Sequence, residues 1–182
     1  MGAVGKSRLP AIVATVVAVP VAVVAGIVVF NAIAPAAEDS DLVQGDLSPV
    51  SVTVPDLGEE DAVVCLALTA TAPEEAGDLV ARPVEGGAGA AEAVLAYGDP
   101  AVVATCGADP VEVEDTAAVY KLNGVCWFTD EDGAVWTTLD RQVPVGVSVP
   151  ADYEQPVDVL NDLSKVIAEK VPAAEDAPTG CA

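Results

Sequence analysis

The strongest constraint on this chain is an uncharged stretch, residues 9–34, whose only polar side chains are Thr15 and Asn31. About 20 apolar residues, at a helical rise of ~1.5 Å each, are enough to cross the hydrocarbon core of a membrane. A backbone in lipid must satisfy its own hydrogen bonds, so we expect residues 9–34 to form a transmembrane helix. The chain is therefore predicted to be anchored in the cytoplasmic membrane.

The charges on either side of this stretch predict its orientation. Lys6 and Arg8 precede it, and acidic residues begin at Glu38. Because positive charge stays on the cytoplasmic side, residues 1–8 are expected inside and the rest of the chain outside. The alternative is a secreted protein with a cleaved signal peptide, for which residues 34–36 (Ala-Pro-Ala) offer a cleavage site. The apolar core of a signal peptide is usually only ~7–15 residues long, which favours the uncleaved anchor.

The exported part of the chain is strongly acidic. All 29 acidic residues lie from Glu38 onward, together with only five of the seven basic residues. This balance argues against binding to nucleic acid, which needs a basic surface. It is compatible with cation binding, cationic partners or high salt, and equally with a role in solubility alone.

Residues 35–49 are predicted to be an acidic linker, and residues 50–182 one exported domain. Short β-branched or aromatic runs between turn residues predict strands. These lie at residues 50–54, 79–84, 93–97, 101–106, 117–120, 125–129, 134–139 and 141–149. Pro83 and Pro144 place the strands at 79–84 and 141–149 toward the edges of the sheet, because proline cannot donate to a ladder.

Two soluble helices are predicted. Acidic residues begin residues 59–72 and Pro73 follows them, which is typical of a helix start and stop. Here Val63, Leu66 and Ala67 fall at helical spacing, with Leu68 one position off, and the Cys65 thiol is expected to face the core or a partner cysteine. Residues 156–171 carry a clearer apolar stripe, formed by Val157, Leu160, Leu163 and Ile167 with Val166 beside them. The predicted fold class is α+β: one antiparallel sheet flanked by helices.

The chain has four cysteines and no histidine. Their spacing does not match a zinc site, and an even number of exported cysteines indicates disulfides. Four cysteines allow three connectivities. Without histidine, the usual Ser-His-Asp and Cys-His nucleophile systems are excluded. The sequence predicts no catalytic residue, no cofactor and no metal motif.

The clearest hairpin turn carries three acidic residues, Asp130, Glu131 and Asp132. These carboxylates are a candidate weak cation site, although they do not follow the EF-hand pattern, and a solvated turn is the simpler interpretation. Trp127 and Trp136 lie on the two strands that flank this turn. They are expected to pack in the core, with a partner-facing aromatic patch as the alternative.

Arg82 and Arg141 are the most informative basic residues, because bases are scarce in so acidic a domain. Each is expected to form an internal ion pair, with Asp99 and Asp140 as candidate partners, or to hold an anionic ligand. Asp99 is also a candidate catalytic carboxylate, but an aspartate before proline is more simply a turn residue.

A set of residues spread over the domain carries a family resemblance. The set comprises Cys65-Leu66, Leu79, Arg82, residues 97–103 (YGDPAVV), Cys106-Gly107, Gly124-Val125, Trp127, residues 136–138, Asp140-Arg141 and residues 147–150. Over roughly residues 50–170 the chain resembles the actinobacterial membrane-anchored family of domain of unknown function 3515 (DUF3515). The resemblance implies an exported domain of the cell envelope, with no established catalytic residues.

The same resemblance implies a disulfide pairing. Family members have cysteines at the positions of Cys65 and Cys106, which leaves Cys126 and Cys181 as an additional pair. The alternative pairing, 106–126 with 65–181, would join neighbouring strands and stays open here.

The sequence thus favours a non-enzymatic, membrane-anchored extracytoplasmic protein that acts as a binding or accessory module for an envelope protein or polymer. Two alternatives come from other classes. One is a hydrolase or transferase that acts on envelope polymers through carboxylates. The other is an acidic, cation-binding surface protein.

Overall fold

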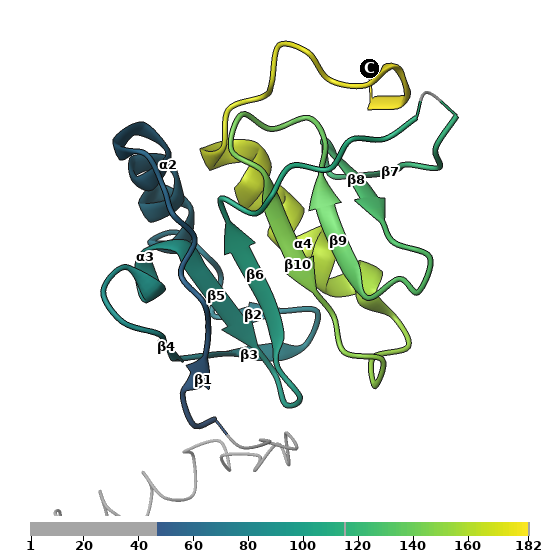
Figure 1. Ribbon diagram of the computed structural model, residues 1–182. Helices are drawn as coiled ribbons and strands as arrows, with labels where there is room; N and C mark the ends of the chain where they lie inside the picture. The colour runs from purple at the N-terminus through teal and green to yellow at the C-terminus, as the bar shows by residue number, and fades with distance from the viewer. Residues whose placement is uncertain (1–46, 115, 182) are drawn as a thin grey trace, which may run out of the picture. The chain divides into compact units, whose positions relative to one another are not determined.

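The computed structural model describes residues 47–114 and 116–181 (Figure 1). The strands are β1 Val50–Ser51, β2 Glu75–Ala76, β3 Leu79–Arg82, β4 Val84–Glu85, β5 Val94–Tyr97, β6 Val102–Cys106, β7 Tyr120–Leu122, β8 Val125–Thr129, β9 Val135–Thr138 and β10 Val145–Ser148. The helices are α2 Glu59–Thr69, α3 Ala90–Ala93, α4 Pro156–Lys170 and the 3₁₀ turn η1 Thr179–Cys181. Within these residues, eight strands form one antiparallel sheet in the order β2-β3-β5-β6-β10-β9-β8-β7, while β1 pairs with β4 in parallel.

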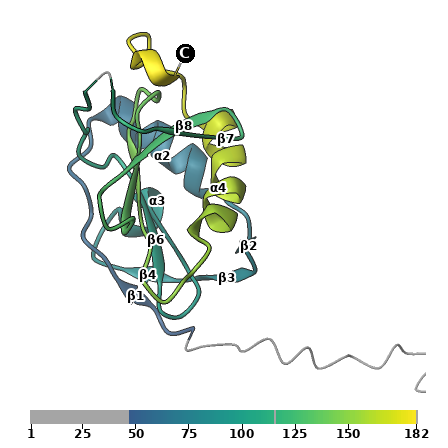
Figure 2. The same cartoon turned by 90° about the vertical axis from the view of Figure 1, so that its right-hand side faces the viewer.

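The two longer helices cover one face of the sheet, which we call the core face. Cys65 of α2 forms a disulfide with Cys106 of β6, and the indole N–H of Trp127 donates to the Ser164 hydroxyl of α4 at 2.9 Å. Figure 2 shows α4 on one side of the sheet and the chain that leads from β1 to α2 on the other. We call this second side the outer face.

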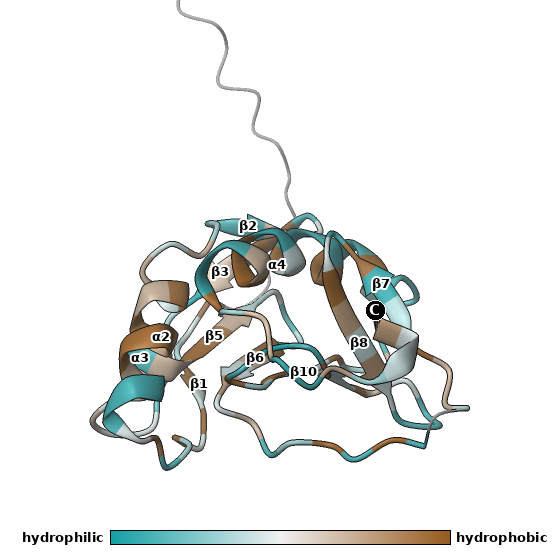
Figure 3. Cartoon of the chain, turned by 90° about the horizontal axis from the view of Figure 1, so that it is seen from above, coloured by the Kyte–Doolittle hydropathy of each residue, from teal (hydrophilic) through white to brown (hydrophobic). Residues whose placement is uncertain are grey.

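The core fills the space between α2, α4 and the sheet. Strand residues alternate between the two faces, so Val102, Ala104 and Cys106 point inward and are almost fully buried. Opposite them, α4 buries Leu160, Leu163, Val166 and Ile167. Hydrophobic residues accordingly gather where α4 meets the strands (Figure 3). The α+β class and the antiparallel sheet predicted from the sequence are confirmed.

The position of β10 corrects one prediction. Pro144 indicated an edge strand at residues 141–149, but β10 lies in the middle of the sheet, between β6 and β9. Proline is tolerated here because the ladder begins one residue later, at Val145, so that no sheet hydrogen bond needs the missing N–H. The Pro144 carbonyl is used instead, and it accepts the backbone N–H groups of Gly107 and Ala108 at 2.8 and 3.1 Å.

The rotation of α2 confirms the expected inward position of Cys65 but not the apolar spacing of Val63 and Leu66. The helix forms as expected, but Val63 is 68% exposed and Leu66 is 49% exposed, while Cys65 and Leu68 are buried. The bond from Cys65 to Cys106 decides which side of α2 faces the sheet. In α4 the predicted stripe is buried except at Val157, which is 38% exposed.

The predicted N-terminal region (residues 1–8), the membrane anchor (residues 9–34) and most of the linker (residues 35–49) lie outside the described residues. Within residues 47–114 and 116–181, no helix has the length and apolar character needed to cross a membrane. Both disulfides are present, and their pairing, Cys65–Cys106 and Cys126–Cys181, is the one that the family resemblance implies.

Candidate functional site

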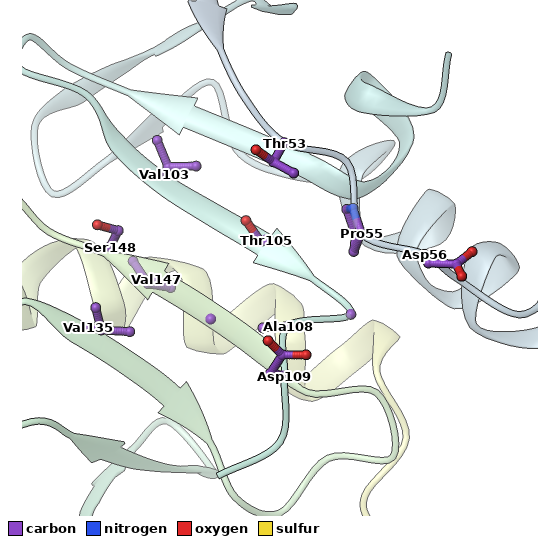
Figure 4. A pocket seen from close by; sticks show the side chains of 12 residues that line it. Thr53, Pro55, Asp56, Val103, Thr105, Ala108, Asp109, Val135, Val147 and Ser148 are labelled. Atoms are coloured by element: carbon purple, nitrogen blue, oxygen red, sulfur yellow. The ribbon is translucent and has the colours of Figure 1, made fainter. Parts of the chain in front are cut away.

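A groove of about 480 Å³ opens on the outer face of the sheet, within the usual range of ligand pockets (Figure 4). Strands β6, β9 and β10 form its floor. The chain before α2 forms one wall, and the chain that follows β6 forms the other. The lining residues are Thr53, Pro55, Asp56, Val103, Thr105, Gly107, Ala108, Asp109, Val135, Gly146, Val147 and Ser148.

The first wall, residues 53–56, is held in place by its two ends. On the N-terminal side, β1 lies against β4, and the Val52 N–H donates to the Glu85 carbonyl at 2.8 Å. On the C-terminal side, Leu57 packs against the α-carbon of Gly107, where a Cβ atom would collide with the leucine side chain. Gly107 also has a φ of +82°, which favours glycine. The position of residues 53–56 therefore depends on contacts with Glu85 and Gly107, which are distant in the sequence.

The second wall, residues 107–109, lies close to strand β10. Its two hydrogen bonds to the Pro144 carbonyl tie it to the start of that strand. Further along β10, Gly146 has no side chain, and a Cβ atom there would lie 2.9 Å from the Cβ atom of Ala108. The glycine thus allows the wall to approach the sheet, and Figure 3 shows the chain between β6 and β7 passing on the side away from α4.

The lining residues combine apolar and hydroxyl groups on the floor with carboxylates in the walls. Val103 and Val135 supply the apolar surface, and Val135 is 45% exposed. Hydroxyl groups come from Thr53, Thr105 and Ser148, while carboxylates come from Asp56 and Asp109, one in each wall. None of the lining residues is basic. The groove is suited to a neutral or cationic ligand with apolar groups, and it repels anions.

Arg141 lies elsewhere and joins three parts of the fold. Its guanidinium donates to both carboxylate oxygens of Asp140 at 3.1 Å and to the carbonyl of Val171, just after α4. It also donates to the Gly124 carbonyl in the turn between β7 and β8. The Arg141 side chain is only 8% exposed, so this bidentate pair is largely protected from solvent.

The acidic turn at residues 130–133 is organised by its first residue. The carboxylate of Asp130 accepts the backbone N–H groups of Ala134 and Val135 at 2.9 and 3.3 Å, and the Trp136 indole donates to the Gly133 carbonyl. Glu131 and Asp132 are exposed. Over the described part of the chain, no group of three or more histidine, cysteine, aspartate or glutamate side chains is arranged to hold a metal ion.

Comparison with protein families identifies what the chain is related to. A family model described as "Protein of unknown function (DUF3515)" matches residues 17–176. The chain belongs to the DUF3515 family. Neither the curated proteins nor the solved structures gave a match. The description of the family carries no activity, so a function for this DUF3515 chain must come from its own residues.

Residues 97–103, one of the motifs that carry the DUF3515 resemblance, span the tight connection from β5 to β6. Arg82 donates to the Gly98 carbonyl at 2.8 Å and to the Asp99 carboxylate at 3.4 Å. It also donates to the Ser48 carbonyl at 2.8 Å, which ties the start of the described chain to the sheet. The Arg82 side chain is 7% exposed. Asp99 thus lies in an ion pair and not among the residues that line the groove.

Two tyrosines complete this connection. The buried phenol of Tyr97 donates to the Pro73 carbonyl at 3.0 Å, and burial raises its pKa to about 12. Tyr153 donates to the Pro100 carbonyl at 2.6 Å. Partial burial, followed by the charges of Asp99 and Asp152, raises the pKa of Tyr153. Both phenols are therefore held as neutral donors in this part of the DUF3515 fold.

The groove itself was missed by sequence reasoning. Its walls and floor come from three stretches far apart in the chain, and its polar residues are ordinary surface types. One signal was available: Gly146, inside an otherwise β-branched strand, indicates the close approach of another backbone. Both tryptophans, Trp127 at 0% and Trp136 at 5% exposure, lie in the core and do not form a partner-facing patch.

Proposed function

We propose that this DUF3515 chain is a membrane-anchored extracytoplasmic domain that acts as a binding or accessory module at the cell envelope, with the outer-face groove as its binding site. The observation that carries the proposal is the Cys65–Cys106 disulfide. Both of its cysteines are at most 1% exposed, and the bond joins α2 to the centre of the sheet. Disulfides built into a core are characteristic of proteins that fold in an oxidising compartment.

The sequence supports the membrane part of the proposal. Residues 9–34 carry no charge and follow Lys6 and Arg8, which is the pattern of a single span with a cytoplasmic N-terminus. The groove supports the binding part. It offers hydroxyls, carboxylates and the apolar side chains of its floor, which together give a ligand both contact area and orientation.

Peptide mapping under non-reducing conditions, on the full chain from fractionated cells, tests the proposal. The expected result is a membrane-bound chain with an intact N-terminus and the bonds Cys65–Cys106 and Cys126–Cys181. Four free thiols would contradict export. A soluble chain that begins near Ala37 would agree with export but would contradict the membrane anchor.

A matched pair of variants tests the anchor directly. Val21→Asp places a charge near the middle of residues 9–34, which costs about 2.5–3.5 kcal/mol on insertion scales. The chain should then leave the membrane fraction or fail to be exported. Val21→Leu keeps the segment apolar and should behave as the unchanged chain. Equal membrane retention of both variants would contradict a spanning segment.

A further inference from the structure

The first wall of the groove leaves backbone available for pairing. Residues 53–57 belong to no helix or strand, and within the described chain they take part in no backbone–backbone hydrogen bond. On either side of them, Val52 donates to the Glu85 carbonyl and the Gly58 carbonyl accepts the Ala62 N–H. Thr53 and Asp56 of this wall are exposed. Apart from proline, each residue of the wall offers one backbone donor and one acceptor. Extended peptides bind some proteins by adding a strand to an exposed sheet edge, and residues 53–56 follow strand β1 directly in the chain.

The charges around the groove select the kind of peptide. Asp56 in one wall and Asp109 in the other are both exposed, and no lysine or arginine lies among the lining residues. The Asp109 carboxylate lies beside the floor, whereas the Asp56 carboxylate lies at the end of the groove and is directed away from the floor (Figure 4). A long basic side chain can therefore reach Asp109 within the groove and Asp56 at its end. Val103 and Val135 on the floor offer contact to apolar side chains that alternate with the basic ones.

We propose that the groove binds an extended basic segment of a partner protein. Its backbone pairs with residues 53–56, its basic side chains reach Asp56 and Asp109, and its apolar side chains pack on Val103 and Val135. This inference rests on the proposed binding function and adds the chemical class of the ligand. The chain's own linker is a poor occupant, because residues 35–46 contain four acidic residues and no basic one.

Peptide titration onto the full chain in detergent tests the inference. The probe is an eight-residue peptide of alternating lysine and valine, acetylated and amidated, with a fluorescent label. Peptides of alternating glutamate and valine, and of alternating serine and valine, are the matched ligands. We expect the lysine peptide to bind at least tenfold more tightly than the serine peptide, and the glutamate peptide not to bind. The preference should decrease as salt is added.

Two pairs of charge-removing variants locate the binding. Asp56→Asn with Asp109→Asn removes both carboxylates of the groove and should weaken binding of the lysine peptide at least tenfold. Glu175→Gln with Asp176→Asn removes the same charge from the exposed C-terminal tail, outside the groove. This control should change binding less than twofold. Equal weakening by both pairs would overturn the inference, since the peptide would then respond only to the overall acidity of the domain.

Other outcomes test separately the backbone pairing and the preference for basic side chains. Displacement of the peptide by spermidine at an equal concentration would contradict strand pairing, because spermidine is a cation without a peptide backbone. Equal binding of the serine and lysine peptides would overturn the basic preference and leave a peptide-binding groove. Absence of binding by all three peptides would overturn the inference entirely. The mapping and membrane-retention experiments involve no peptide, so failure of the proposed location would be seen separately.

Discussion

The two faces of the sheet differ in what stabilises them. On the core face, α2 and α4 lie over Val102, Ala104 and Cys106, and the packing is apolar and closed. On the outer face, two segments without secondary structure flank β6 and β10 and leave a groove between them. Each face has one disulfide. On the core face, Cys106 is bonded to Cys65 of α2. Cys126, which is bonded to Cys181, directly precedes Trp127 in β8; because neighbouring strand residues point to opposite faces and Trp127 points to the core, Cys126 points to the outer face. The core face is thus closed by packed helices, whereas the outer face leaves a groove open, and the proposed binding uses that groove.

The two disulfides give the largest test of this difference. They close loops of 41 and 55 residues, for which the chain-entropy model gives about 4 kcal/mol each. We expect Cys65→Ala with Cys106→Ala to cost at least that amount, because the bond fills space in the core. We expect Cys126→Ala with Cys181→Ala to cost less, because the released C-terminal tail gains freedom in the folded state.

Urea unfolding of the two double variants measures this order directly. The tail has few other attachments, among them the bridge between Arg141 and Ala173 and the bond from the Ala174 N–H to the Asp140 carbonyl. Far-UV circular dichroism of each variant before the titration shows whether it is folded. An equal loss of unfolding free energy in both variants would contradict the prediction that the core-face disulfide stabilises the fold more than the outer-face disulfide.

The core face also predicts a response to high pH. In the folded state the pKa of Tyr97 is raised from 10.0 to about 12, so its neutral form is favoured by folding. Its contribution is present in full below pH 10 and is lost as the pH rises from 10 to 12. Tyr97→Phe should cost about 0.5–1.5 kcal/mol at pH 7, because the hydrogen bond to the Pro73 carbonyl is lost. Above pH 10 the difference between the two proteins should shrink.

Unfolding free energies of both proteins, measured from pH 7 to pH 12, test this prediction. Every other titratable group is common to both proteins and cancels in the difference. A difference that stays constant up to pH 12 would show that the Tyr97 phenol ionises equally easily in the folded and unfolded chain.

Much of the core face could be predicted from local patterns. The α4 stripe of Leu160, Leu163 and Ile167 repeats at helical spacing and is buried as expected. In α2 the local pattern was misleading, because Val63 and Leu66 are exposed while Cys65 is buried. A short helix rich in alanine carries little information about its orientation, and the distant partner Cys106 determines it. That pairing followed from the family resemblance and not from the cysteine spacing.

The outer face was largely hidden from sequence reasoning. Pro144 marked a break in the ladder, but nothing local indicated that its carbonyl would hold residues 107 and 108 from another part of the chain. The groove exists only once β6, β10 and the chain before α2 are brought together. Asp56 and Asp109 are two among 29 acidic residues, so their position in the groove could not be distinguished beforehand.

The smallest expected effect on stability is that of the two carboxylates in the groove. Asp56 and Asp109 are exposed, and no ion pair or hydrogen bond of their side chains contributes to the fold among the described residues. Replacing both with asparagine should therefore change the unfolding free energy by at most about 0.5 kcal/mol. Any change should be toward greater stability at low salt, because two charges are removed from a strongly acidic domain. Urea unfolding at two salt concentrations, with Glu175→Gln and Asp176→Asn as the control, measures it. A loss of 1 kcal/mol or more in unfolding free energy, seen only in the Asp56 and Asp109 variant, would mean that these carboxylates stabilise the walls. Residues of the outer face would then stabilise the fold as those of the core face do.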